Sequence, residues 1–536
     1  MSDAVDVIVI GAGPSGAVVT HTLATAGFEV TCLEQGDWVS PSDFPGNLEE
    51  WELLAQQRWH HDPNVRKLPA DYPLETSESD LSPVMFNGVG GSSIKFGALW
   101  IRLLPSDFRV RTLDGVADDW PISYEDLKPY HDEVDLFIGA SGFDGDTAYP
   151  DGLTYPMPPH PLGPAGLKAA AACNELGWHW WPGSNAIVTH KHKTLEPCVG
   201  KGVCVWGCTE GAKASFDLIY MPQALQAGAR LVTGARVRQI LTTSDGRADG
   251  VTWIDREGSE HVLRASAVVI CANGIGTPRL LLASANEQFP DGLANSSGMV
   301  GRNLMLHPNC SVTGYYGESL NGWRGPIGEL IHSMQFYDTD PSHGFVRGSK
   351  LHASTFPGPL MTLNTHRRLS FDELWGTSFH DIVRRHAGSM LWAANVEDLP
   401  ELDNRVTLDD TLTDDQGMPA PRVRYRVSDN TRRILRFTVD RMRDLHVAAG
   451  AEAMFDVELW PDEPGHLLGT ARMGADPQTS VVDSFGRCHD VDNLFIADGS
   501  IFVTSGSANP TATIAALALR VGQRIVETAR LARSAS

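Results

Sequence analysis

Residues 5–34 read VDVIVIGAGPSGAVVTHTLATAGFEVTCLE, and this stretch decides the fold. Val5 to Ile10 form an almost unbroken apolar run, which is typical of a parallel strand buried on both faces. A helical stretch follows, and a second apolar strand ends at Glu34. The order strand, helix, strand predicts the first unit of a Rossmann-type α/β domain.

The turn after the first strand carries glycines in the pattern G-x-G-x-x-G. Gly11 permits a tight turn, Gly13 lets the backbone approach a pyrophosphate, and Gly16 lets helix and strand pack closely. The helix N-terminus offers free N–H groups to the phosphates, and Glu34 is placed to accept hydrogen bonds from an adenosine ribose. These features predict a bound dinucleotide, either NAD or FAD. A glycine-rich turn without a ligand is the alternative.

Composition limits the classes of function. The chain has 536 residues, so we expect two domains or one elaborate domain. Its formal net charge of −23 argues against nucleic acid and anionic membranes as partners. We find no apolar run of the about 18 residues that a transmembrane helix needs. Because the first apolar stretch belongs to the fold, we expect no secretory signal and a cytoplasmic protein.

The pattern changes several times after Glu34. Residues 36–82 favour a long excursion with short helical pieces, and residues 212–230 favour one helix. In residues 300–460 apolar and polar residues alternate in short stretches, NRVTLDD and RVRYRVSD among them. This alternation predicts an antiparallel sheet with one face open to a ligand.

Two polar residues near the C-terminus are candidates for chemistry. His466 lies in GHLLGTARMG, and Asn509 directly precedes Pro510 and a long apolar helix. A histidine can take the proton of an alcohol because its pKa can be set near neutrality. An asparagine can hold the same oxygen. Their separation in sequence does not show that they meet, and a lone histidine in a loop is more often a structural hydrogen-bonding group.

Five ordered motifs resemble the glucose–methanol–choline (GMC) oxidoreductase family. They are the N-terminal fingerprint, NGVGGSS, ANGIGTPRLLLAS, SGMVGRNLMLHP and the C-terminal series HLLGTARMG, NLFIADGS and NPTATIAALALRVGQRI. The resemblance implies FAD rather than NAD, and oxidation of an alcohol by hydride transfer to flavin N5. It also implies an α/β fold with a Rossmann-type FAD-binding domain (1–105, 206–308 and 462–536) interleaved with an antiparallel-sheet substrate domain (106–205 and 309–461).

The resemblance also implies roles for individual residues. His466 matches the general base of the family, and Asn509 matches the second active-site position. Gly90, Gly91 and Ser92 match the loop against the isoalloxazine, and Val237 the position whose backbone holds the adenine. The expected cofactor-binding residues are Gly11, Gly13, Gly16, Glu34, Gly90, Gly91, Ser92, Val237, Asp498, Gly499, Asn509 and Thr511.

One departure bears on how FAD is held. Some relatives link FAD covalently through a histidine just after the Gly-Gly-Ser stretch, and Lys95 stands at that place here. We therefore expect non-covalent FAD.

A loop with Cys198, Cys204 and Cys208 leaves three interpretations open. The thiols can be free, they can hold an iron–sulfur cluster as a similar loop does in some multi-subunit sugar dehydrogenases of the family, or they can bind zinc or form a disulfide. We favour free thiols and expect no metal. The aromatic run Trp178–Trp181 and His307 are interpreted as structural.

The stretch EDLPELDNRVTLDD resembles gluconate dehydrogenase-like and pyranose or glycoside oxidase-like members. It implies that a secondary hydroxyl of a sugar or glycoside, at C3 or C2, is oxidised to a ketone with oxygen as acceptor. The alternatives are a dehydrogenase that passes electrons to a quinone or cytochrome, a non-redox FAD-containing lyase, and a flavin-binding module without catalysis. A homo-oligomer is possible.

Overall fold

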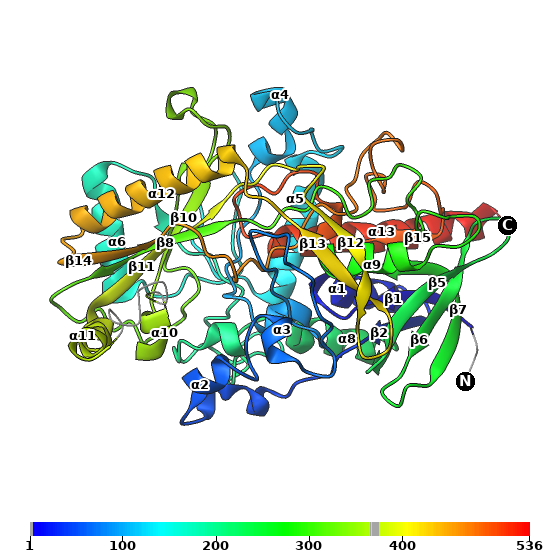
Figure 1. Cartoon of the computed structure of the whole chain (residues 1–536), viewed down its shortest axis with the longest axis horizontal. Coiled ribbons are helices and arrows are strands. Elements are labelled where there is room, and N and C mark those ends of the chain that lie inside the picture. The colour runs from blue at the N-terminus through cyan, green and yellow to red at the C-terminus, as the bar shows by residue number, and fades with distance from the viewer. Residues whose placement is uncertain (1–3, 365, 367–374, 536) are drawn as a thin grey trace.

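Two sheets organise the computed structural model, which describes residues 4–364, 366 and 375–535 (Figure 1). The domain ranges expected from the sequence run from residue 1 to 536, and their other positions lie outside the described residues. The two sheets lie toward opposite ends of the long axis in Figure 1. The first sheet has the order β4-β2-β1-β7-β6-β5, with β15 also paired to β7. Its strands are β1 (Ala4–Ile10), β2 (Val30–Glu34), β4 (Arg230–Thr233), β5 (Arg236–Thr242), β6 (Ala248–Ile254), β7 (Glu260–Ile270) and β15 (Leu494–Ile496).

Strand β1 lies at the centre of this sheet, parallel to both β2 and β7. Ile8 and Ile10 point into one apolar core, whereas Val7 and Val9 point into the core on the other face. Burial on both faces explains why the strand reads as a continuous apolar run. On the Val7 face, helix α1 (Pro14–Thr25) packs against α8 (Met221–Gln226) and α13 (Thr511–Ala535), and α5 (Tyr124–Ile138) packs on α13.

The second sheet is antiparallel, with the order β14-β8-β11-β10-β9-β3. Its strands are β3 (Trp181–Pro182), β8 (Asn309–Tyr315), β9 (Ile331–Phe336), β10 (Ser349–Ser354), β11 (Ser389–Val396) and β14 (Ala453–Val457). One face, with Val312, Leu351 and Trp392, packs in an apolar core under α12 (Asp429–Ala448) and α6 (Gly163–Leu176). The alternate residues carry polar side chains on the opposite face, as the period-2 pattern predicts.

Two local predictions differ from the structure. The stretches NRVTLDD and RVRYRVSD contribute a separate hairpin, β12 (Arg405–Thr413) and β13 (Pro419–Arg424), which packs on α9 (Asn273–Ala283) rather than joining the large sheet. Arg279 of α9 explains the attachment, because its guanidinium donates to Pro419 O at 2.7 Å and to Asp414 at 2.8 Å. The single helix expected at 212–230 is two short helices, α7 (Phe216–Ile219) and α8.

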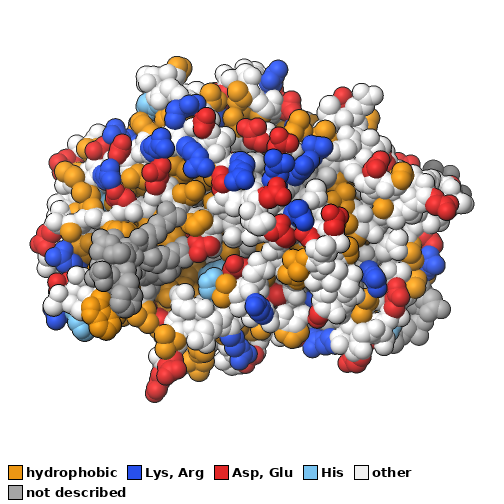
Figure 2. All heavy atoms as spheres, in the orientation of Figure 1, with side chains coloured by type: hydrophobic (Ala, Val, Ile, Leu, Met, Phe, Trp, Pro, Cys, Tyr) orange, Lys and Arg blue, Asp and Glu red, His pale blue; other side chains and the backbone are white. Residues whose placement is uncertain are grey.

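The other α-helices are short. They are α2 (Trp51–Ala55), α3 (Pro63–Arg66), α4 (Val110–Asp114), α10 (Pro359–Asn364) and α11 (Thr377–Arg385). None of the helices in the described residues is long and apolar enough to cross a membrane. Figure 2 shows a band of Lys and Arg across the upper part of one face, interspersed with Asp and Glu, so both signs of charge mix on this face despite the net negative charge.

Candidate active site

One cavity of about 600 Å³ joins the two sheets. Glu34 and Val237 line it beside the first sheet, and His466 and Asn509 line it beside the second. The cavity is lined by ten of the twelve expected cofactor-binding residues: Gly11, Gly13, Glu34, Gly91, Ser92, Val237, Asp498, Gly499, Asn509 and Thr511. Residues from both ends of the chain therefore meet around one space, as the sequence motifs imply.

The two remaining glycines, Gly16 and Gly90, shape the cavity from behind. A Cβ at Gly16 would lie 1.8 Å from Gly11 O, so only glycine lets α1 approach the turn. Gly90 has φ +92°, and a Cβ there would lie 2.8 Å from a carboxylate oxygen of Asp217. Its N–H donates to Ala12 O at 2.8 Å and so ties the Gly-Gly-Ser loop to the fingerprint turn.

Glu34 has its carboxylate fixed by backbone. Oε2 accepts from Ala12 N and Oε1 accepts from Gly36 N, both at 2.8 Å. Each oxygen keeps a further lone pair, so the group can still accept from a ribose hydroxyl. Val237 lies on β5 where the pairing with β6 shifts register between Val237 and Gln239, and this irregularity interrupts the regular ladder beside the cavity.

The carboxylate of Asp498 accepts three hydrogen bonds from other groups of the protein. Oδ2 accepts from Thr277 Oγ1 at 2.6 Å and from Asn273 N at 3.0 Å, and Oδ1 accepts from Ser500 N at 2.9 Å. It therefore holds the start of α9 against the loop that contains Gly499. A Cβ at Gly499 would lie 2.8 Å from Leu467 O, so this loop packs closely on the segment that follows His466.

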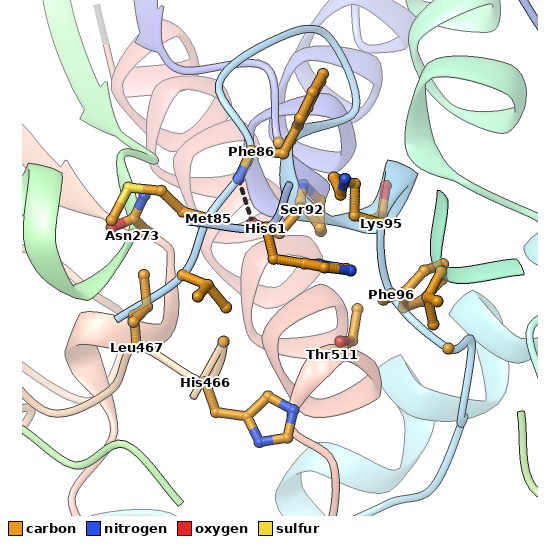
Figure 3. Close-up of a pocket in the computed structure, with 18 of the residues that line it drawn as sticks. His61, Met85, Phe86, Ser92, Lys95, Phe96, Asn273, His466, Leu467 and Thr511 are labelled. Atoms are coloured by element: carbon orange, nitrogen blue, oxygen red, sulfur yellow. Dashed lines mark hydrogen bonds between the residues drawn. The ribbon is translucent and has the colours of Figure 1, made fainter. Parts of the chain in front are cut away.

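Figure 3 shows His61, Ser92, Lys95, His466 and Thr511 around this cavity. The Lys95 ammonium donates to the carbonyl of Trp59, and Ser92 Oγ accepts from Phe86 N at 3.2 Å. Sequence reasoning missed His61, which lines the cavity and whose pKa is held well below its ordinary value by burial and by the charge of Lys95. No family motif covered its stretch, so only the fold could reveal it.

His466 forms a pair with another histidine, His307, which the sequence analysis treated as structural. Their Nδ1 atoms lie 2.8 Å apart, and His307 Nε2 lies 3.2 Å from Ser505 O. A carbonyl oxygen only accepts, so His307 must carry its proton on Nε2 and present a bare Nδ1. His466 must then carry its proton on Nδ1, which leaves the lone pair on its Nε2.

Both histidines are uncharged at neutral pH. Burial lowers the pKa of His466 well below its ordinary value, and repulsion from His307, in its protonated form, and from Lys350 lowers it further. Burial also lowers the pKa of His307, although Asp398 opposes the shift. A neutral imidazole with a free Nε2 can accept a proton from a hydroxyl in the cavity.

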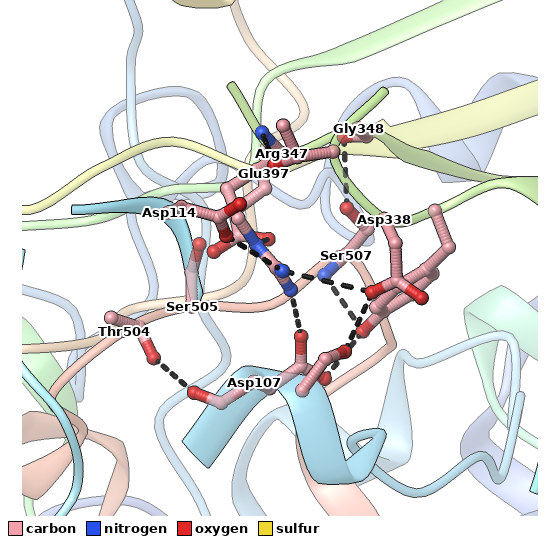
Figure 4. A network of polar contacts seen from close by, with 12 residues as sticks. Asp107, Asp114, Asp338, Arg347, Gly348, Glu397, Thr504, Ser505 and Ser507 are labelled. Atoms are coloured by element: carbon pink, nitrogen blue, oxygen red, sulfur yellow. Dashed lines mark hydrogen bonds and ion pairs between the residues drawn. The ribbon is translucent and has the colours of Figure 1, made fainter. Parts of the chain in front are cut away.

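Asn509 lies directly before α13, and its Oδ1 accepts from Lys350 Nζ at 3.0 Å. The segment before it is fixed by contacts to distant parts of the chain: Ser507 N donates to Tyr337 OH at 3.0 Å, and Thr504 Oγ1 donates to Asp107 O at 2.8 Å. Figure 4 shows this network around Arg347, whose buried guanidinium joins Asp107 and Glu397.

The polar face of the second sheet forms the other side of the cavity. Asn309 and Asn395 are opposite one another on β8 and β11, and Ala393 of β11 lies opposite His352 of β10. Asn309, His352 and Asn395 line the cavity, and so does Ser311. The alternating pattern predicted such a face without identifying these residues.

Cys198, Cys204 and Cys208 are free thiols, and no group of three or more His, Cys, Asp or Glu side chains in the described residues is arranged to hold a metal. In the aromatic run, Trp178 packs on Phe336 with ring centroids 4.8 Å apart. None of its four residues is among the described residues that line the cavity.

Comparison with known proteins gives a consistent result. Residues 5–309 and 400–518 match the N- and C-terminal parts of the family described as GMC oxidoreductase. The chain is 42% identical to 2-methyl-1,2-propanediol dehydrogenase of Mycolicibacterium austroafricanum, covering 98% of this chain and 95% of that protein. It is 30% identical to the fructose dehydrogenase large subunit of Gluconobacter japonicus, covering 97% of each. It is also 30% identical to 6'''-hydroxyparomomycin C oxidase of Streptomyces lividus, covering 97% of this chain and 91% of that protein.

Among solved structures, a formate oxidase variant of Aspergillus oryzae RIB40 superposes with a TM-score of 0.65 at 14% identity and covers 98% of both chains. This likeness confirms the expected α/β architecture. The two family matches together span most of the chain. The chain therefore belongs to the GMC oxidoreductases, an FAD-binding family whose members oxidise alcohol and sugar hydroxyls.

Proposed function

We propose that the protein oxidises a hydroxyl of a sugar or related polyol, with His466 as general base and Asn509 as the second group on the reacting oxygen. Two hydrogen bonds in series carry the proposal: His307 donates to Ser505 O, and His466 donates to His307. They leave Nε2 of His466 unprotonated beside the cavity. There it accepts the hydroxyl proton as the hydride leaves carbon. General base catalysis of this kind contributes roughly 10²–10⁴-fold.

The residues around the cavity fit FAD. The close turn at Gly11, Gly13 and Gly16 and the start of α1 suit the pyrophosphate, and Glu34 suits the ribose. When bound, FAD supplies the two-electron acceptor for the hydride. We propose that it is held without a covalent bond, because Lys95 stands at the linkage position. Acid precipitation should release all of the flavin into the supernatant, whereas flavin retained in the pellet would contradict this.

The substrate proposal rests on the polar sheet face. Asn309, Ser311, His352 and Asn395 offer several hydrogen-bonding groups to one molecule, as a polyhydroxylated ligand requires. We propose a secondary hydroxyl at C3 or C2 of a pyranose or glycoside, supported by the sugar-oxidising members that the sequence resembles. A small diol is the second candidate, favoured by the 42% identity to a diol dehydrogenase.

Flavin bleaching without oxygen distinguishes these substrates. Glycosides, free pyranoses and 1,2-diols are added in turn to the purified protein, and the visible flavin absorbance is followed. Bleaching by sugars with ketone formation supports the first proposal, whereas bleaching only by diols supports the second. If cyanohydrins are cleaved and no alcohol bleaches the flavin, the protein is a non-redox lyase.

The electron acceptor is a separate proposal. The sequence expectation is oxygen, and one relative above is named an oxidase. Two others are named dehydrogenases, which favours a quinone or cytochrome as the second candidate. Hydrogen peroxide formed in air in proportion to product supports oxygen. Reoxidation of the flavin by a quinone but not by air supports the alternative.

A further inference from the structure

A ladder of buried charges leads from Asn509 into the second sheet. Lys350 donates to Asn509 Oδ1 and forms an ion pair with Glu329. Glu329 Oε1 lies 2.8 Å from His332 Nδ1, and His332 Nε2 lies 2.8 Å from Asp146 Oδ2. The side chains of Lys350, Glu329, His332 and Asp146 are at most 2% exposed. The proposed base catalysis uses none of them.

The charges in this ladder alternate in sign when Lys350 is protonated. Burial lowers the pKa of Lys350, and the charge and hydrogen bond of Glu329 oppose this shift. Burial opposes ionisation of Glu329, but the charges of Lys350 and His332 lower its pKa to about 2. Burial likewise opposes protonation of His332, but Glu329 and Asp146 raise its pKa to about 9. At neutral pH both are therefore charged. A buried pair of this kind is costly to separate, so Lys350 is held firmly in place.

The position of Lys350 fixes the orientation of the Asn509 amide. An ammonium has donors and no acceptor, so the amide must direct its oxygen to Lys350. Its nitrogen then lies at the other end of the planar amide, away from the ladder. The hydrogen bond from Lys350 to Oδ1 is thus the contact that distinguishes the two orientations of the amide.

We propose that Lys350, anchored by Glu329, is a positioning residue that makes Asn509 a hydrogen-bond donor to the reacting oxygen of the substrate. This inference rests on the proposed function. It assigns complementary roles to two groups on one oxygen: His466 Nε2 accepts the proton while Asn509 Nδ2 donates to the oxygen as it becomes negatively charged. A donor aimed at developing charge stabilises the transition state more than the ground state.

The test measures the rate of flavin reduction without oxygen at saturating substrate, on the pH plateau where His466 is neutral. We expect K350M to lower this rate roughly 10- to 10²-fold, with a smaller effect on substrate affinity. K350R keeps the charge and a donor and should recover most of the rate. K168M is the matched control, because Lys168 lies on α6, which covers the opposite face of the same sheet.

A double-mutant cycle separates positioning from a general electrostatic effect. If Lys350 acts through Asn509, K350M should have little further effect in an N509L background. The double variant K350M/E329Q removes both charges, so no unpaired carboxylate is buried if K350M alone unfolds.

The pH profile gives a second readout. His307 and Lys350 are the titratable groups that lower the pKa of His466, so K350M should move the acid limb of kcat/KM to higher pH.

Two results would overturn the inference: a K350M/E329Q rate within twofold of wild type, or an effect of K350M that is undiminished in N509L. Failure of the proposed function looks different, because wild-type flavin would then not be reduced by any sugar or polyol.

Discussion

Replacing His307 tests the tautomer of His466 directly. In the wild type, His466 Nδ1–H donates to His307 Nδ1 at 2.8 Å inside a buried site. H307L removes the acceptor, so the competent tautomer would leave a buried N–H unpaired. That costs about 1–3 kcal/mol, which corresponds to a rate lower by roughly 5- to 150-fold. In H307N the side-chain amide can place its oxygen, an acceptor, near the position of His307 Nδ1. This variant should therefore recover much of the rate.

Stopped-flow flavin reduction at saturating substrate is the assay, with thermal unfolding and flavin content measured in parallel. His307 has φ +49°, a conformation that asparagine tolerates better than leucine, so part of the loss of stability in H307L is backbone strain. The rate comparison is therefore made only at temperatures where both variants are folded and loaded with FAD. Equal rates for H307L and wild type would refute the tautomer assignment.

Three further predictions concern pH, cofactor binding and stability. The neutral form of His466 is the active one, and its pKa is lowered. We therefore expect kcat/KM to rise with pH, with the midpoint of the rise below pH 6.5, and to stay constant at higher pH. A midpoint above pH 6.5 would contradict this. G16A places a Cβ 1.8 Å from Gly11 O and should destabilise the fold by at least about 1–3 kcal/mol with loss of bound flavin, measured by denaturant unfolding and absorbance. R347M leaves Asp107 and Glu397 buried without their shared cation and should cost about 3–5 kcal/mol in the free energy of unfolding; a change below about 1 kcal/mol would show that the network does not stabilise the fold.

Local patterns were sufficient for much of the fold. The strand at Val5 to Ile10 and the alternating stretches of the second sheet can be predicted from the order of residues. A strand buried on both faces is a continuous apolar run, whereas a strand buried on one face alternates apolar and polar residues. The hairpin β12–β13 has the same alternation as the large sheet. Its attachment to α9 depends on Arg279, which is distant in sequence, so alternation alone could not assign it.

The candidate site was predicted in part for the same reason. His466 and Asn509 lie in motifs that the sequence displays, and the structure brings them to one cavity. The groups that orient them, His307 and Lys350, act across 159 residues of chain in each case. No spacing within the sequence indicates such contacts. His307 was nevertheless inside a quoted motif, and its place directly before Pro308 was the sign that the sequence offered; its positive φ became visible only in the structure.

The most direct test of the account compares wild type and H466A, each loaded with FAD, on addition of sugars and polyols without oxygen. We expect at least one of these hydroxyl compounds to bleach the flavin of the wild type. We also expect H466A to retain FAD and to be bleached at least roughly 10²-fold more slowly. Bleaching of H466A at the wild-type rate would contradict the central claim that His466 is the base.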